Sequence, residues 1–114
     1  MKEIKQGEIY LVQWDPSLGH EFKKTRPGIV LSSERVLRQS NLVSFLPITT
    51  TTHSPIQEDI LIQKNEKNRL LMDSLIKVQH VSSFDKTRIV RHIGDVSDKI
   101  LDQIKAYLRQ HFDL

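Results

Sequence analysis

The stretch GEIYLVQW at residues 7–14 predicts the first strand of a mainly β protein. It is rich in β-branched and aromatic side chains, which fit the pleated surface of a sheet. The next two residues, Asp15 and Pro16, favour a turn and so end the strand.

Further strands are expected downstream, because short apolar segments recur between turn-forming residues. Pro47 lies in one of these segments and cannot donate a ladder hydrogen bond, so we expect it at a sheet edge or a bulge. The expected strands are 28–32, 42–48, 59–62, 74–81 and 88–93, with a turn or short helix at 33–41.

The C-terminal segment has a different period, which predicts an amphipathic helix. Ser97 is its expected N-cap, and Asp98 in the first turn suits the helix dipole. The apolar residues that recur at three- and four-residue steps are Val96, Ile100, Leu101, Ile104, Tyr107, Leu108 and Phe112.

Several short strands followed by one terminal helix predict a mainly β, α+β fold, built as a small closed or half-closed barrel. A chain of 114 residues fits one domain, expected to span residues 1–114.

The composition suits a soluble globular protein, with 38% hydrophobic and 27% charged residues. The 17 Lys and Arg residues exceed the 14 Asp and Glu residues, which permits a polyanionic ligand without demanding one. The absence of cysteine excludes disulfides and thiolate metal sites. No apolar run is long enough to cross a bilayer, and the first residues lack the apolar core of a secretory signal. We therefore expect a cytoplasmic protein without membrane contact.

The first candidate site is a predicted long loop at residues 15–27, which contains His20, Glu21 and the cations Lys23, Lys24 and Arg26. Pro27 biases Arg26 toward an extended conformation and so fixes its direction. A guanidinium held in this way can grip a phosphate with two parallel hydrogen bonds. The alternative is a solvated basic loop.

The second candidate site is the threonine run 49–52, whose hydroxyls follow a buried strand and can donate to phosphate oxygens. The alternative is ordinary turn chemistry.

The third candidate site lies in segment 74–81. Alternation places Ser74, Ile76, Val78 and His80 on one face and Leu75, Lys77 and Gln79 on the other. Alternatively, Lys77 is a surface charge and His80 a partly buried, hydrogen-bonded ring.

Other chemistries lack the required residues. The histidines form no His-x-x-x-His pair, and neither Gly-x-Ser-x-Gly nor a glycine-rich phosphate loop is present. We expect no metal and no cofactor.

Taken together, several segments resemble the MazF/PemK toxins. They are 7–12, 15–21, 24–30, the Pro47-Ile48-Thr49 strand end, 74–88 and 93–96, and they cover nearly the whole chain. The resemblance implies a small SH3-like barrel of the kind shared with CcdB gyrase poisons, with a C-terminal helix. It also implies a homodimer, metal-independent cleavage of single-stranded RNA, and a partner antitoxin that occupies the RNA groove.

The resemblance makes Arg26 and Thr49 the central catalytic pair and matches His20 to a position that some members use for base or substrate work. Two departures stand out: Glu21-Phe22 replaces a common Glu-Gln, and Gln79-His80 replaces Glu-Gln or Asp-Gln. If the missing carboxylate transfers protons in relatives, either that role passes to Glu21, His20 or His80, or the activity is low.

Metal-free RNA cleavage needs a base for the 2′-hydroxyl, stabilisation of charge on the phosphate, and an acid for the leaving oxygen. Arg26 and Thr49 suit the second task, and proton transfer is assigned to Glu21 or His20. The expected substrate-binding residues are Lys23, Lys24, Thr50, Lys77, Gln79 and His80.

Three alternatives stay open beside this reading. They are a gyrase poison of the same fold, a barrel that binds RNA without cutting it, and a structural barrel with no site. Trp14 or Phe22 is a candidate for base stacking, with a core role for Trp14 as the alternative.

Overall fold

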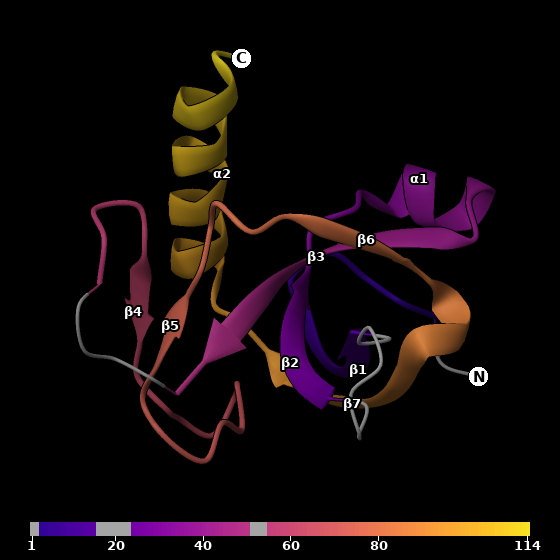
Figure 1. Ribbon diagram of the computed structural model, residues 1–114, viewed down its shortest axis with the longest axis horizontal. Coiled ribbons are helices and arrows are strands. Elements are labelled where there is room, and N and C mark those ends of the chain that lie inside the picture. The colour runs from indigo at the N-terminus through magenta and orange to yellow at the C-terminus, as the bar shows by residue number, and fades with distance from the viewer. Residues whose placement is uncertain (1–2, 16–23, 51–54) are drawn as a thin grey trace.

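Figure 1 shows the computed structural model of the chain, in which residues 3–15, 24–50 and 55–114 are described. The described residues form seven strands, two α-helices and one 3-10 turn. They are β1 (Glu8–Asp15), β2 (Lys24–Val30), α1 (Glu34–Gln39), β3 (Leu42–Thr49), β4 (Ile60–Ile62), β5 (Ser74–Ile76), β6 (Ser82–Asp85), the 3-10 turn η1 (Lys86–Arg88), β7 (Ile89–Asp95) and α2 (Asp98–Phe112).

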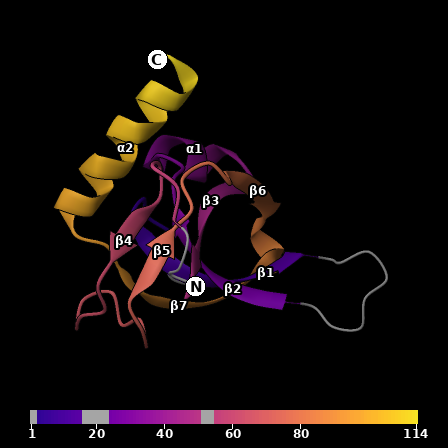
Figure 2. The same cartoon turned by 60° about the vertical axis from the view of Figure 1, so that its left-hand side comes forward.

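The strands form one antiparallel sheet in the order β4-β5-β3-β2-β1-β7, with β6 also paired to β3. β3 is the hub, because it pairs with β2, β5 and β6 along different parts of its length. η1 turns the chain from β6 into β7, and the sheet curls around its interior (Figure 2). The predicted mainly β, barrel-like fold with a C-terminal helix is confirmed.

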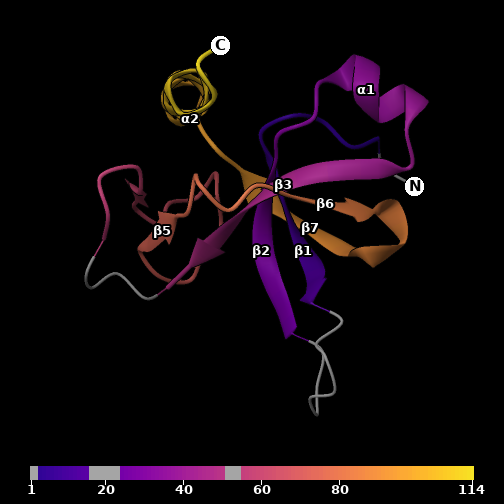
Figure 3. The same ribbon diagram turned by 45° about the horizontal axis from the view of Figure 1, so that its top comes forward.

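Two hydrophobic clusters lie on the two faces of this sheet. β1 supplies both, since Ile9 joins one cluster while Tyr10 and Val12 join the other. α2 packs against the first cluster through Ile104, and α1 contributes Leu37 to the second. Figure 3 shows the two helices over separate parts of the sheet.

α2 begins as predicted. The Ser97 side chain accepts a hydrogen bond from the Ile100 amide at 3.2 Å, and Asp98 lies in the first turn. The helix ends at Asp113, which adopts a left-handed conformation with φ of 57°. Neither helix in the described residues is long and apolar enough to cross a membrane.

The loop predicted at 15–27 is too long. Thr25, Arg26 and Pro27 belong to β2 and pair with Gln13, Val12 and Leu11 of β1. Polar composition misled the prediction because Thr25 and Arg26 at this end of β2 are exposed, so the strand needs no apolar pattern there.

The strand predicted at 74–81 is also too long, and the alternation drawn from it is wrong. β5 ends at Ile76, and Ser74, Leu75 and Ile76 are all buried. The chain then turns, with the His80 amide donating to the Lys77 carbonyl at 3.1 Å, so Gln79 and His80 are exposed. β6, which follows this turn, was not predicted.

Pro47 lies inside the sheet, so the expected edge position is wrong. It is opposite Gly28 of β2, and its carbonyl accepts from the Lys77 amide at 3.1 Å on the opposite side. Its missing N–H falls on this second side, where the β6 ladder has ended at Phe45 and the β5 ladder begins at Ile48. The proline therefore costs no ladder hydrogen bond.

Candidate functional site

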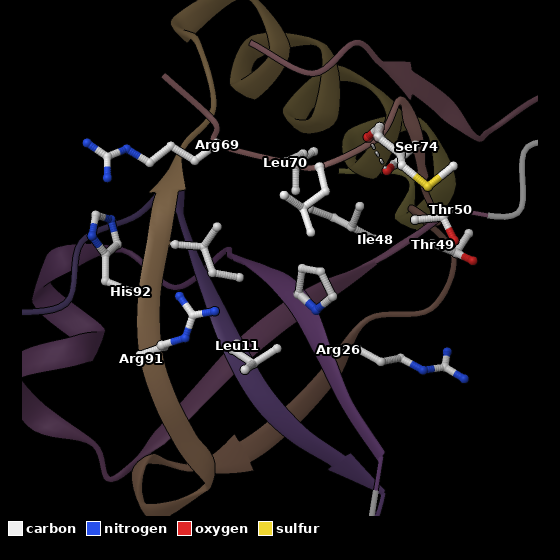
Figure 4. Close-up of a pocket in the computed structure, with 14 residues that line it drawn as sticks. Leu11, Arg26, Ile48, Thr49, Thr50, Arg69, Leu70, Ser74, Arg91 and His92 are labelled. Atoms are coloured by element: carbon white, nitrogen blue, oxygen red, sulfur yellow. Dashed lines mark hydrogen bonds between the residues drawn. The ribbon is translucent and has the colours of Figure 1, made fainter. Parts of the chain in front are cut away.

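A cavity of about 730 Å³ opens where the ends of several strands meet the segment 69–74 (Figure 4). It brings together residues from five strands, β1, β2, β3, β5 and β7, and from the loop before β5. The residues that line it are Leu11, Arg26, Pro27, Ile48, Thr49, Thr50, Arg69, Leu70, Leu71, Met72, Ser74, Arg91, His92 and Ile93.

The cavity has cationic groups at two ends and apolar side chains between them. The Arg26 end consists of Arg26, Thr49 and Thr50, and the Arg69 end consists of Arg69, Arg91 and His92 (Figure 4). Between them, apolar side chains including Leu11, Ile48 and Leu70 form the floor.

None of the lining residues is acidic, and none of the three guanidinium groups forms an ion pair within the described part of the chain. The cavity therefore suits an anion that also carries flat or apolar groups.

The sheet register explains how Arg26 meets Thr49. The last β2–β3 pair is Gly28 with Pro47. Arg26 lies two residues before Gly28, and Thr49 lies two residues after Pro47, so both lie just beyond the end of this ladder. A shift of two residues keeps the same face of the sheet, so both side chains reach the same cavity.

The loop before β5 is held rigidly by Asn68, which is buried. Its Oδ1 accepts from the amides of Asn65 and Leu70, each at 3.0 Å, and its Nδ2 donates to the Gln63 carbonyl at 2.9 Å. The next residue, Arg69, has a positive φ of 55°, which an L-residue adopts at a cost.

Gly94 lets this loop sit directly on β7. A Cβ at residue 94 would lie 2.4 Å from the Asn68 carbonyl oxygen. The Asp95 amide donates to the Lys67 carbonyl at 3.0 Å, which ties the loop to the same strand. β7 also carries Arg91, so the close approach fixes Arg69 relative to Arg91.

His92 is held by a partly buried polar cluster behind the Arg69 end. Its Nε2 lies 3.1 Å from Asp95 Oδ1 and 3.7 Å from Glu8 Oε2. The Tyr10 hydroxyl donates to Glu8 Oε1 at 2.9 Å. Burial, and then the hydrogen bond to Glu8, raise the pKa of the Tyr10 phenol above its ordinary value.

The ligand atoms of Glu8, His92 and Asp95 all lie within 4.8 Å of one another, a spacing that a metal ion could bridge. Glu8 already accepts from the Lys5 amide at 2.7 Å and from Tyr10. The cluster supports His92 through the hydrogen bond to Asp95. No spacing of paired histidines in the sequence indicates it, because Glu8 lies near one end of the chain and His92 and Asp95 lie near the other.

Of the remaining predicted site residues that the structure describes, Thr50 lines the cavity, and Lys77, Gln79 and His80 lie outside it. Lys77 Nζ lies 2.6 Å from Asp59 Oδ2, whose side chain is only 1% exposed. Gln79 and His80 are exposed on the turn after β5, not partly buried as the alternative reading of His80 had it. His20, Glu21 and Lys23 lie outside the described residues, as does the Lys24 side chain.

Trp14 has a core role. Its ring lies edge-on to Phe84 with centroids 4.9 Å apart, and to Phe45 at 6.3 Å. A Cβ at Gly28 would lie 2.9 Å from the Trp14 ring, so the glycine leaves room for the indole. This packing uses the ring inside the barrel and not as a platform for a base.

Sequence reasoning missed Arg69, Arg91 and His92 as site residues. Nothing in the local sequence marks Arg91 or His92 as a site residue. Arg69 directly follows Asn68, a turn-forming residue, which is the one local signal.

Comparison with known proteins places the chain among toxins. A family model described as PemK-like, MazF-like toxin of type II toxin-antitoxin system matches residues 5–112. The chain is 27% identical to endoribonuclease MazF9 of Mycobacterium tuberculosis over 116 residues, which covers 97% of this chain and 98% of that protein.

Solved structures share its fold. A crystal structure of MazF from Deinococcus radiodurans is similar with a TM-score of 0.82 and 17% identity, covering 100% of both chains. A mycobacterial endoribonuclease in complex with its cognate antitoxin is similar with a TM-score of 0.72 and 17% identity, covering 100% of this chain and 97% of that chain.

Proposed function

This chain belongs to the PemK-like, MazF-like toxins of type II toxin–antitoxin systems, and from that premise we propose that it is a metal-independent endoribonuclease that cleaves single-stranded RNA. The observation that carries the proposal is the meeting of Arg26 and Thr49 on one face of the sheet, in a cavity without acidic lining residues. A gyrase poison that acts through its helix has no need of this pair.

The proposed reaction is attack of a ribose 2′-oxygen on the adjacent phosphate. The bond from the 2′-oxygen to phosphorus forms and the bond from phosphorus to the 5′-oxygen breaks, which leaves a cyclic phosphate and a free 5′-hydroxyl. Negative charge grows on the phosphate oxygens along the way. The Arg26 guanidinium and the Thr49 hydroxyl donate to those oxygens, and such donors are worth most where charge develops.

Two protons must move in this reaction, one from the 2′-hydroxyl and one to the leaving 5′-oxygen. Neither Arg26 nor Thr49 is a base at neutral pH. We assign the transfers to Glu21 or His20, with His80 as the remaining candidate from the sequence.

The proposal assigns the flanking phosphates to Lys23, Lys24, Thr50 and Lys77. It assigns Gln79 and His80 to contacts with the same RNA strand. Thr50 lines the cavity beside Thr49, which supports its assignment. Lys77 would exchange its ion pair with Asp59 for a phosphate.

The proposal includes two partners. One is a second copy of the chain, because a barrel of this size has little surface on which to cradle several nucleotides. The other is a cognate antitoxin, as seen in the similar mycobacterial complex. The proposed compartment is the cytoplasm, where single-stranded messenger RNA is the substrate.

The deciding experiment is incubation of the purified protein with a long RNA in EDTA, followed by mapping of the new ends. The proposal expects discrete cuts with 5′-hydroxyl ends, which Arg26→Ala and Thr49→Ala each abolish or slow. RNA that is bound but left intact would instead establish an RNA-binding barrel without cleavage.

A further inference from the structure

We infer that the Arg69 end of the cavity, formed by Arg69, Arg91 and His92, is a second phosphate subsite that binds the substrate RNA away from the cleaved bond. The inference rests on the proposed RNA cleavage and adds a site that the Arg26–Thr49 pair does not require. Its ligand is a backbone phosphate of the same RNA strand.

The arrangement of charge in the cavity supports this subsite. Arg26 lies at one end and Arg69 and Arg91 at the other, and the apolar floor between them carries no charge (Figure 4). A single-stranded RNA repeats this pattern, because charged phosphates alternate with bases and sugars that pack on apolar surface. With one phosphate at the Arg26 end, another phosphate of the same strand would meet Arg69 and Arg91.

The two arginines are available for a ligand. Both residues are exposed, and neither is in an ion pair within the described residues. Two guanidinium groups without an ion-pair partner among the described residues favour a polyanion over a neutral or basic ligand.

The backbone of Arg69 points to a function for its side chain. Its φ of 55° lies in the left-handed region, where glycine is relaxed and a residue with a Cβ is strained. Strained residues of this kind gather at binding sites, where a side chain is needed at that position. A glycine would satisfy the turn but would remove the guanidinium from the mouth of the cavity.

The subsite is also built before any ligand arrives. Asn68 fixes the turn through its three side-chain hydrogen bonds, and the close approach at Gly94 presses that turn onto β7. Because β7 carries Arg91 and His92, the three side chains of the subsite start from one rigid frame. Preorganisation of this kind lowers the entropy lost on binding.

The test uses a fluorescein-labelled, random-sequence 2′-O-methyl RNA of roughly 12 nucleotides, long enough to cross both ends of the cavity. Methylation removes the attacking hydroxyl, so binding is measured without cleavage. The variants are Arg69→Gln, Arg91→Gln and Arg69→Gly. The matched control is Arg109→Gln, which makes the same charge change on an exposed residue of α2 that does not line the cavity.

Each cavity variant is expected to weaken binding by about five- to tenfold relative to the control. The slope of log affinity against log salt should fall by about 0.7 for each lost phosphate contact. With cleavable RNA, KM should rise while kcat stays near the wild-type value, because the contact lies away from the reacting atoms. Arg69→Gly should have a higher melting temperature than the wild type, because glycine is relaxed at this positive φ. Its weaker binding therefore cannot be attributed to misfolding.

If wild type binds and cuts RNA but the Arg69 and Arg91 variants bind like Arg109→Gln, the subsite is wrong and the proposed function stands. If these variants lose affinity only for the antitoxin, this end of the cavity serves the protein partner and the subsite is again wrong. Failure of the wild type to bind or cut RNA would remove the proposed function itself.

Discussion

Arg26 and Thr49 lie two residues beyond the last pair of the β2–β3 ladder, Gly28 with Pro47, and both line the same cavity. Each is held by a different neighbouring strand, Arg26 by β1 and Thr49 by β5. The pairing of these strands therefore sets the geometry of the proposed catalytic pair.

Replacing Arg26 by alanine should reduce the rate of RNA cleavage in EDTA by about 10²-fold or more, as expected for a lost donor to developing charge. Arg38→Ala, on the exposed face of α1, provides the matched control. RNA affinity should be measured in parallel. Cleavage by the Arg26 variant at the wild-type rate would contradict its catalytic role.

The pH dependence of cleavage should distinguish His20 from Glu21 as the group that transfers protons. If His20 does so, the rate should follow a group titrating near pH 6.5, within about one unit. If Glu21 does so, the rate should change only at lower pH. The profiles of wild type, His20→Ala and Glu21→Gln are compared, with RNA binding measured separately. If both variants keep wild-type rates, the proton moves through His80 or water.

The protein should be a homodimer in solution. A single barrel offers one short cavity, and pairing two would give a longer groove for RNA. Sedimentation at micromolar concentration checks this, and a mass near that of one 13.3 kDa chain would count against it.

Gly94→Ala should lower the free energy of unfolding by about 1–3 kcal/mol, the usual cost of forcing atoms into a well-packed place. The new Cβ would lie 2.4 Å from the Asn68 carbonyl oxygen, and this backbone atom cannot swing away. Urea denaturation measures the change. Val90→Ala, on the exposed part of β7, is the control and should change stability far less.

Stability should fall as the pH rises above about 10, the ordinary pKa of tyrosine. The pKa of Tyr10 is raised in the folded protein, first by burial and then by Glu8, so the unfolded chain loses this proton first. Below the pKa of tyrosine in the unfolded chain, the contribution of Tyr10 to stability is fully present. In urea denaturation between about pH 9 and 11, Tyr10→Phe should lose less unfolding free energy than the wild type. The difference is the contribution of the one proton that Tyr10 keeps in the folded protein and loses in the unfolded chain. An equally steep loss in the variant would refute the assignment to Tyr10.

Much of the fold could be predicted because its signals are local. The apolar spacing of α2 and its Ser97 cap lie within one stretch of chain, as does the β-rich composition of β1. The same holds for Pro27, which identified Arg26 as an extended residue.

The strand predictions were wrong where burial or strand pairing overrides the local sequence pattern. β5 is covered on both faces, so Ser74 is as buried as its apolar neighbours and alternation is lost. β6 carries two serines and an aspartate among its four residues, and it forms because β3 offers it a partner.

By itself the sequence determined a β-rich barrel with a terminal helix and a family, and its resemblance to that family made Arg26 and Thr49 the proposed catalytic pair. Only the tertiary structure decided that these two share a cavity with Arg69 and Arg91. The register of β2 against β3 and the contact of the Asn68 turn with Gly94 join residues far apart in the chain. Such contacts depend on how whole elements pack, and no local period in the sequence records them.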